Sequence, residues 1–481
     1  MRGSPTSGGV RIPVSAYRPR RPDLAGLTRL ALPVVLVQVG MMTMGAVDTI
    51  MVGRVTATDL AAVAIGNLYF FGVAVFGMGV LFALDPVISQ AVGARDADAV
   101  ARGVQRGGLI ALALTVVASL LLMPAGPILG ALRQPPDVVP VAAGYAWASI
   151  LGVYPFYGFV VLRQSLQAMG KVRPLIWTVA AANVVNVVLN WLLIYGNMGA
   201  PELGAVGSGW ATSFSRWFMM LMTVVVAWPL LRPSLWPIRP QAMHLKPLVR
   251  LLRVGAPIGA QQSLEFGVFG AAGLLTGVMG TIQLASHQVA LQLAALTFML
   301  PVGVAQATSV LVGQAVGRAD PPGARRAVGA GLLVGVGFMS VTAALFLVVP
   351  RPLAALFSVD QRVIATAATL LPIAGVFQVF DGLQVVSAGA LRGVADTRVP
   401  MILNFVGFWL IGLPICVLLC LGLGRGPTGV WWGLAIGIAI VALLLLQRVH
   451  VRFGRALRRV VIDDVDADDA DPTDTKRTRS T

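Results

Sequence analysis

The stretch that decides the fold runs from Val254 to Gly317 and reads VGAPIGAQQSLEFGVFGAAGLLTGVMGTIQLASHQVALQLAALTFMLPVGVAQATSVLVGQAVG. These 64 residues carry one formal charge, at Glu265. Because roughly 20 apolar residues cross the core of a bilayer, the stretch is long enough for two membrane spans. Glu265 then lies near the middle of the first span. A carboxylate at that depth is costly and usually serves transport or a partner side chain.

The composition of the whole chain indicates a polytopic membrane protein. Of 481 residues, 57% are hydrophobic and 12% are charged, and the mean hydropathy is +0.82. The charges form short clusters between apolar runs. The sequence has no phosphate-cradling Gly-rich motif, metal-ligand cluster or nucleophile elbow. We therefore expect neither an enzyme nor an ATP-driven pump, and no cofactor other than a coupling ion.

Charged residues, prolines and glycines separate the apolar runs into twelve predicted spans. The predicted fold class is therefore an all-α membrane protein, with two pseudo-symmetric bundles of six helices. An even number of spans places both termini on the same side of the membrane. The predicted spans are 30–53, 60–92, 104–125, 138–162, 174–196, 204–231, 250–279, 283–316, 327–350, 364–390, 400–423 and 428–448.

The distribution of Lys and Arg predicts the orientation. The loops after odd-numbered spans carry five basic residues, Arg54, Arg133, Arg351, Arg362 and Arg425. The loops after even-numbered spans carry sixteen, namely Arg95, Arg102, Arg106, Arg163, Lys171, Arg173, Arg232, Arg239, Lys246, Arg250, Arg253, Arg318, Arg325, Arg326, Arg392 and Arg398. By the positive-inside rule both termini are cytoplasmic, in a bacterial cytoplasmic (inner) membrane. The net charge of +16 then reflects topology and contact with anionic lipid, and no nucleic-acid partner is expected.

The sequence also repeats itself at an offset of 224 residues. Pro33 matches Pro257, Gly79 matches Gly303, and Gln-Ala-Val-Gly at 90–93 recurs at 314–317. Because six spans separate the copies, the halves share an orientation and a substrate site is expected between them near the midplane. The predicted domains are a disordered basic arm (1–24), an N-lobe (25–231), a linker (232–249), a C-lobe (250–450) and a disordered charged tail (451–481).

Two carboxylates lie among amide side chains in the predicted C-lobe spans, Glu265 and Asp381. Carboxylate and amide oxygens suit a hard cation, so we expect Na⁺ at Glu265 and Asp381. A desolvated carboxylate also suits proton exchange, and two neighbouring acids can share one proton. A purely structural hydrogen-bonding role is the remaining alternative. The amides that form the predicted C-lobe cavity are Gln261, Gln288, Gln292, Gln378 and Gln384.

A second polar pocket is predicted in the N-lobe around Asp48, which we expect to be a third cation-coupling acid. Gln38 and Met41 share its helical stripe, Thr212 lies in span 6, and span 5 presents three asparagines on one face, Asn183, Asn186 and Asn190. The alternative is that the asparagines only fasten helices together. Asp85 and Arg216 are each isolated in apolar surroundings, and the sequence leaves open whether they pair, line the cavity or snorkel to the interface.

The sequence resembles the multidrug and toxic compound extrusion (MATE) family over residues 25–450, and in particular its NorM-like bacterial branch. The resemblance rests on ALPVVLVQVGMMTMGAVDTIMVGR, the paired SQAVG and GQAVG segments, NVVNVVLNWLLIYG and DGLQVVSAGALRGVADTRVP. It implies two six-helix bundles around a central cavity, exporting organic cations in exchange for Na⁺ or H⁺. By motif it implies an N-lobe site at Asp48, Asn186, Asn190 and Thr212, and a C-lobe cation site at Glu265 and Asp381.

Three functions remain as hypotheses at this point. The first is a monomeric multidrug antiporter for small organic cations, in which the ion and the substrate compete for the carboxylates. The second is a lipid-linked oligosaccharide flippase of related two-lobe plan, which would need a cationic cavity for pyrophosphate. The third is a non-transporting receptor or scaffold, which would not need acids in each half.

Overall fold

The computed structural model describes residues 13–463, and this part of the chain contains helices but no β-strand. Within it, nine helices are long and apolar enough to cross a membrane, or eleven when each of two bent pairs counts as one span. The remaining predicted span, 250–279, corresponds to the helix Leu245–Gly277, which is not among these helices. The number of twelve spans therefore stays a prediction. The all-helical membrane fold predicted from the sequence is confirmed.

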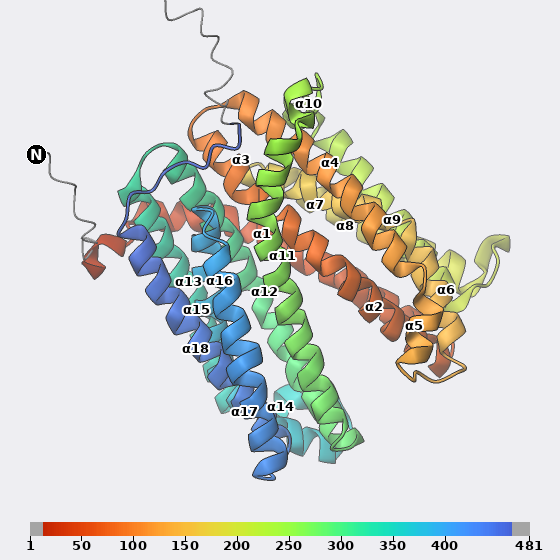
Figure 1. Ribbon diagram of the computed structural model, residues 1–481. Coiled ribbons are helices and arrows are strands. Elements are labelled where there is room, and N and C mark those ends of the chain that lie inside the picture. Colours follow the sequence, from red (N-terminus) through yellow and green to blue (C-terminus); the bar gives the residue numbers. More distant parts are fainter. Residues whose placement is uncertain (1–12, 464–481) are drawn as a thin grey trace, which may run out of the picture.

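The helices form two lobes that meet at one end and spread apart toward the other (Figure 1). The N-lobe contains α1 (Arg21–Val52), α2 (Ala57–Leu81), α3 (Leu84–Gly93), α4 (Ala97–Leu122), α5 (Ala125–Ala131), α6 (Val139–Ile150), α7 (Val153–Ala168), α8 (Arg173–Tyr195), α9 (Gly204–Val226) and α10 (Trp228–Leu235). The C-lobe contains α11 (Leu245–Gly277), α12 (Thr281–Gly317), α13 (Pro321–Val348), α14 (Pro350–Ala355), α15 (Gln361–Gly393), α16 (Arg398–Asn404), α17 (Leu413–Val417) and α18 (Pro427–Phe453). Short 3₁₀ turns at Val14–Tyr17 (η1), Asn197–Gly199 (η2) and Pro240–Met243 (η3), and π-helical turns at Phe405–Gly412 (η4) and Leu418–Gly422 (η5), complete the chain.

Helix ends follow local sequence signals that repeat in the two lobes. The Asp96 side chain accepts a hydrogen bond from the backbone N–H of Ala99 and starts α4. Asp320, at the equivalent position of the second repeat, accepts from the N–H of Gly323 and starts α13. Such caps satisfy backbone donors that a helix leaves unpaired at its first turn. The same local chemistry therefore positions corresponding helices in both lobes.

The lobes contact each other through the repeated Gln-Ala-Val-Gly segments. A Cβ atom on Gly93 would overlap the carbonyl oxygen of Gln314, and one on Gly317 would overlap that of Gln90. The two amides also cross the interface in matching fashion: Gln90 donates to the carbonyl of Gly393 and Gln314 to that of Ala168, each at 2.9 Å. The repeated motif thus forms a pseudo-symmetric seam that allows two backbones to pack closely.

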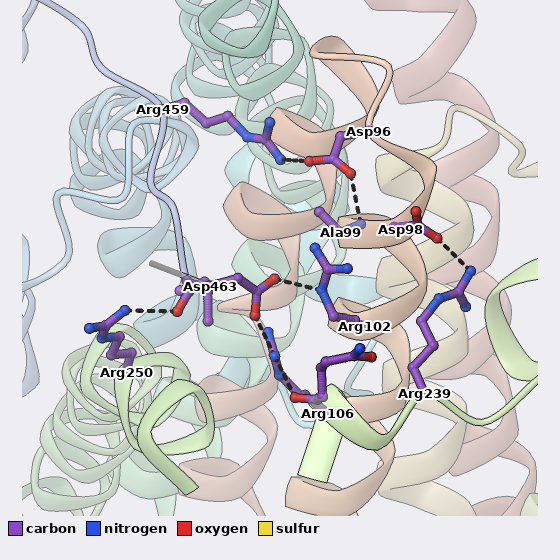
Figure 2. A network of polar contacts seen from close by, with 11 residues as sticks. Asp96, Asp98, Ala99, Arg102, Arg106, Arg239, Arg250, Arg459 and Asp463 are labelled. Atoms are coloured by element: carbon purple, nitrogen blue, oxygen red, sulfur yellow. Dashed lines mark hydrogen bonds and ion pairs between the residues drawn. The ribbon is translucent and has the colours of Figure 1, made fainter. Parts of the chain in front are cut away.

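The chain after α18 crosses from the C-lobe to the N-lobe at this closed end, which corrects the prediction of a disordered tail from residue 451. We call residues 455–463 the strap. Arg459 pairs with Asp96 at 2.8 Å, the N–H of Val460 donates to Gln90 at 2.8 Å, and Ile462 is buried. Asp463 pairs with Arg102 at 2.7 Å and also with Arg106 (Figure 2). Residues 464–481 lie outside the described residues.

The predicted disordered N-terminal arm is also ordered where the structure describes it. Residues 1–12 lie outside the described range, but η1 packs against α13 and α1 begins at Arg21. The side chain of Asp23 pairs with Arg326 of the C-lobe at 3.2 Å. The first turns of α1 therefore hold the N-terminal segment against the opposite lobe, as the strap holds the C-terminal segment.

Candidate functional site

Asp48 organises a buried polar network in the N-lobe. Its Oδ1 accepts hydrogen bonds from Asn186 Nδ2 at 3.0 Å and from Asn190 Nδ2 at 2.6 Å. Its Oδ2 accepts from Thr212 Oγ1 at 2.8 Å. All four side chains are buried. Because Asn186 and Asn190 are one turn apart on α8, the helix places both amides on the face that meets α1. The predicted grouping of these four residues is therefore what the structure shows.

The Asp48 network borders a cavity of about 100 Å³ between α1, α2, α6, α7 and α9. A cavity of this size accepts the end group of a ligand rather than a whole drug-sized molecule. Sequence reasoning found Met41, Asp48 and Thr212 but missed the aromatic and amide groups, because helices far apart in sequence contribute them. The lining residues are Met41, Met44, Gly45, Asp48, Thr49, Val63, Asn67, Phe71, Tyr145, Phe156, Thr212, Arg216 and Met219.

Two predicted members of the N-lobe pocket do not reach Asp48. Gln38 accepts a hydrogen bond from Arg163 Nη1 at 2.5 Å, and Asn183 donates to the backbone carbonyl of Gly40 at 2.9 Å. Gln38 lies ten residues before Asp48, which is about 15 Å along a helix. These two residues share a stripe with the site but fasten α1 to α7 and α8.

In the C-lobe, Glu265 is held by two of the predicted amides. Its Oε1 accepts from Gln261 Nε2 at 3.2 Å within α11 and from Gln384 Nε2 at 2.8 Å across from α15. Gln384 also contacts Asn404 Oδ1 of α16 at 3.2 Å. Asn404 was missed, since a single Asn at the start of a π-helical segment gives no periodic signal. Glu265 itself remains partly exposed.

Asp381 is the neighbour of Glu265 and the less constrained of the two acids. It forms no hydrogen bond or ion pair with the described residues, and its side chain is partly exposed. The carboxylates of Asp381 and Glu265 interact electrostatically. No described cationic side chain forms a salt bridge with either acid, although Arg392 interacts electrostatically with Glu265. When the pair is desolvated, a bound cation or a proton would balance its remaining charge.

The remaining predicted C-lobe amides lie elsewhere. Gln378 is buried and hydrogen-bonds to Thr297 of α12 and Thr342 of α13. Gln288 and Gln292 lie on the exposed face of α12, opposite the stripe that packs in the lobe core, and hydrogen-bond to neither acid. Of the five predicted amides, Gln261 and Gln384 are the two that hydrogen-bond to Glu265. Both of these glutamines contact Glu265 through their amide nitrogens.

Asp85 joins the lobes at their closed end, and does not pair with Arg216. It is fully buried, accepts from Gln164 Nε2 at 2.9 Å, and lies 3.7 Å from Arg392 Nη1 of the C-lobe. The sequence placed Arg392 in a cytoplasmic loop, but its side chain lies at the end of α15 with 11% exposure. Sequence periodicity gave no means of pairing residues from different lobes.

Arg216 lies in the N-lobe, beside the Asp48 cavity. Its side chain is buried, with the guanidinium 4.1 Å from the centre of the Phe70 ring and 5.4 Å from that of Phe156. Asp48 and Arg216 interact electrostatically but form no salt bridge. Of the three alternatives left open by the sequence, the one in which Arg216 lines the cavity is correct.

A comparison with protein-family models finds one match in each lobe. The MatE model matches twice, at residues 33–192 and 257–418. The two matches start 224 residues apart and fall one in each lobe, which agrees with the repeat. The chain belongs to the MatE family.

Curated MatE relatives cover most of the chain. It is 36% identical over 456 residues to a probable multidrug resistance protein NorM of Mesorhizobium japonicum, covering 92% of this chain and 97% of the relative. It is 35% identical to the multidrug resistance protein NorM of Photobacterium profundum, covering 89% and 96%. It is 34% identical to the multidrug resistance protein MdtK of Pectobacterium atrosepticum, covering 88% and 94%.

Solved MATE structures share the two-lobe fold. The eukaryotic MATE transporter AtDTX14 superposes with a TM-score of 0.84 at 22% identity, covering 91% of this chain and 98% of that one. A multidrug resistance MATE family transporter in an outward-facing conformation superposes with a TM-score of 0.80 at 18% identity, covering 92% and 97%. At these identities the comparison supports the fold alone.

Proposed function

We propose that this MatE protein is a secondary multidrug antiporter that exports amphipathic, mostly cationic organic compounds in exchange for Na⁺ or H⁺. The observation that carries the proposal is the neighbouring pair of carboxylates at Glu265 and Asp381, which no described cationic side chain neutralises by a salt bridge. The names of the curated relatives support the substrate class. Both polar sites lie within one chain, which supports a transporter that works as a monomer.

The orientation follows from the basic loops. Arg102 pairs with the strap at the closed end, and Arg95 and Arg318 follow the Gln-Ala-Val-Gly segments that meet there. By the positive-inside rule this end faces the cytoplasm, with both termini, in a bacterial cytoplasmic membrane. The lobes then spread apart toward the outside (Figure 1).

The physical scheme is competition for one pair of charges. A cation that binds from outside neutralises Glu265 and Asp381, and the attraction for a cationic substrate is lost. Closing the cavity over two unneutralised acids would bury like charges, so either the ion or the substrate must be bound during interconversion. One positive charge moving inward at 100 mV supplies about 2.3 kcal/mol for export.

The alternative, a lipid-linked oligosaccharide flippase, is disfavoured by the polarity of the site. A pyrophosphate group requires cations, whereas the C-lobe site has two acids and no described salt-bridge partner. The named relatives are multidrug resistance proteins.

The test is efflux of ethidium from proteoliposomes at clamped voltage, with the Na⁺ and pH gradients imposed separately. We expect efflux to follow one of the two gradients and to be lost in Glu265→Gln and Asp381→Asn. Gln288→Ala is the matched control, because this exposed amide contacts neither acid. Efflux that ignores both gradients, or that survives in both acid variants, contradicts the proposal.

A further inference from the structure

The two lobes present polar sites of different charge. The C-lobe site holds Glu265 and Asp381. The N-lobe cavity holds Asp48 and, on another helix, Arg216. At the 224-residue offset, Arg216 corresponds to Ile440, and Glu265 corresponds to Met41. The repeat thus supplies a common scaffold, while the charged groups differ: two acids in one lobe, and one acid with one base in the other.

Arg216 is fixed in place without being neutralised by a direct partner. The rings of Phe70 and Phe156 hold its guanidinium by cation–π contacts. Its Nη1 atom is buried and has no hydrogen-bond partner. Both Asp48 and Arg216 line the same cavity, yet no salt bridge forms between them. An Arg normally donates up to five hydrogen bonds, so this guanidinium retains donors for a ligand.

The carboxylate of Asp48, in contrast, is already satisfied. Asn186, Asn190 and Thr212 donate to its two oxygens. A ligand that enters the cavity therefore finds hydrogen-bond donors available on Arg216, whereas Asp48 already accepts three hydrogen bonds.

We propose that Arg216 is a specificity-determining residue, which makes the N-lobe cavity a site for an acidic or strongly hydrogen-bond-accepting end group of the substrate. The inference rests on the proposed transport function and narrows its substrate class. The preferred substrates are amphiphiles that carry a cationic group for the Glu265–Asp381 pair and a carboxylate for Arg216. The planar guanidinium binds a carboxylate through two parallel hydrogen bonds.

The experiment compares two dyes that share one scaffold. Rhodamine 110 has a free carboxyl group, and rhodamine 123 is its methyl ester and lacks that negative charge. Binding to purified protein is measured by fluorescence anisotropy at fixed pH and salt. We expect Arg216→Gln to weaken the binding of rhodamine 110 by about tenfold, the loss expected for a charge-assisted hydrogen bond. The binding of rhodamine 123 should be unchanged or tighter. Arg216→Lys should keep part of the preference for the acid.

Thermal unfolding establishes that each variant is folded. Arg216→Met, whose unbranched stem can cover Phe70, replaces Arg216→Gln if the latter is unstable. Equal effects on both dyes, or no effect on either, overturn the inference. Because binding needs no ion gradient, the result is independent of transport. If the wild type shows no gradient-driven efflux but still binds the acidic dye through Arg216, only the antiport is rejected. If efflux is normal but substitution of Arg216 does not change the preference between the dyes, only the role of Arg216 is rejected.

Discussion

At the scale of single residues, Asp48 illustrates how a buried charge is held. Three donors from α8 and α9 share its two oxygens, and a buried carboxylate without such partners would cost several kcal/mol. Asn183, on the same helix about one turn before Asn186 and two turns before Asn190, donates only to backbone carbonyls. Asparagines on α8 therefore have two roles: Asn186 belongs to the Asp48 network, whereas Asn183 binds the backbone of α1.

This difference yields a prediction about coupling between side chains. Asp48→Asn and Asn186→Ala should each reduce the efflux rate. In the double variant, the change in activation free energy should differ from the sum of the single changes by about 1 kcal/mol or more, because the two residues share one network. The measurement is initial efflux rate in proteoliposomes with equal amounts of each variant. Asn183→Ala combined with Asp48→Asn is the control and should be additive. Additive effects in both pairs would show that Asp48 and Asn186 act separately.

At the scale of helices, the closed end depends on glycines that repeat in the two lobes. Gly93 and Gly317 allow α3 and the end of α12 to approach through their backbones. Gly79 and Gly303, which also match at the 224-residue offset, do the same against Gly259 and Val35. These close approaches are the physical reason for the repeated glycines, which the sequence alone shows only as a pattern.

A methyl group at this seam should open the closed end. Gly93→Ala and Gly317→Ala are each expected to shift the lobes apart, because the new Cβ meets backbone atoms that cannot rotate away. Electron–electron distance measurements between spin labels at Ala97 and Arg318, in a background without Cys416 and Cys420, would detect a longer and broader distribution. Gly108→Ala on α4, where nothing lies within 4 Å, should leave the distribution unchanged. An unchanged distribution in Gly93→Ala would contradict the steric account.

Helical periodicity predicted the elements and the face of each polar residue, but not the depth or partner of the side chain. It located Glu265, Asp381 and the Asp48 group because their spans are strongly apolar. It grouped Gln378 and Gln292 with the acids because it cannot show which neighbouring helix a face meets. Contacts between lobes, such as Asp85 with Arg392, depend on packing of residues 307 positions apart, for which a single sequence carries no signal.

At the scale of the whole molecule, the strap ties the two lobes together at their closed end. Arg459 and Asp463 come from the chain that follows the last C-lobe helix, and their partners lie on or before α4 of the N-lobe (Figure 2). Burial alone would raise the pKa of Asp463, but hydrogen bonds from Arg106 and Arg102 hold it below its ordinary value. The ionised strap therefore favours contact between the lobes at this end.

The lowered pKa sets the pH dependence of the strap. The ion pairs of Asp463 stabilise the strap fully above the unfolded-state pKa of an Asp, about 3.9. This stabilisation is lost as the pH falls through the lower pKa that Asp463 has in the folded protein. Asp463→Asn should release the strap at neutral pH as well. We expect amide hydrogen exchange in residues 455–463 to become about tenfold faster, consistent with the loss of charged hydrogen bonds. Asp360→Asn, in an exposed pair at the other end of the molecule, is the control. Unchanged exchange in Asp463→Asn would show that the ion pairs do not hold the strap.

In the proposed transport cycle, the ion and the substrate compete for Glu265 and Asp381. The most direct test is the affinity of purified protein for a fluorescent organic cation as Na⁺ concentration and pH are varied separately. In the wild type we predict that affinity falls as Na⁺ rises or as pH falls, according to which ion is coupled. In the double variant Glu265→Gln with Asp381→Asn we predict weak binding that does not respond to either. The same ion dependence in the wild type and the double variant would contradict the central claim.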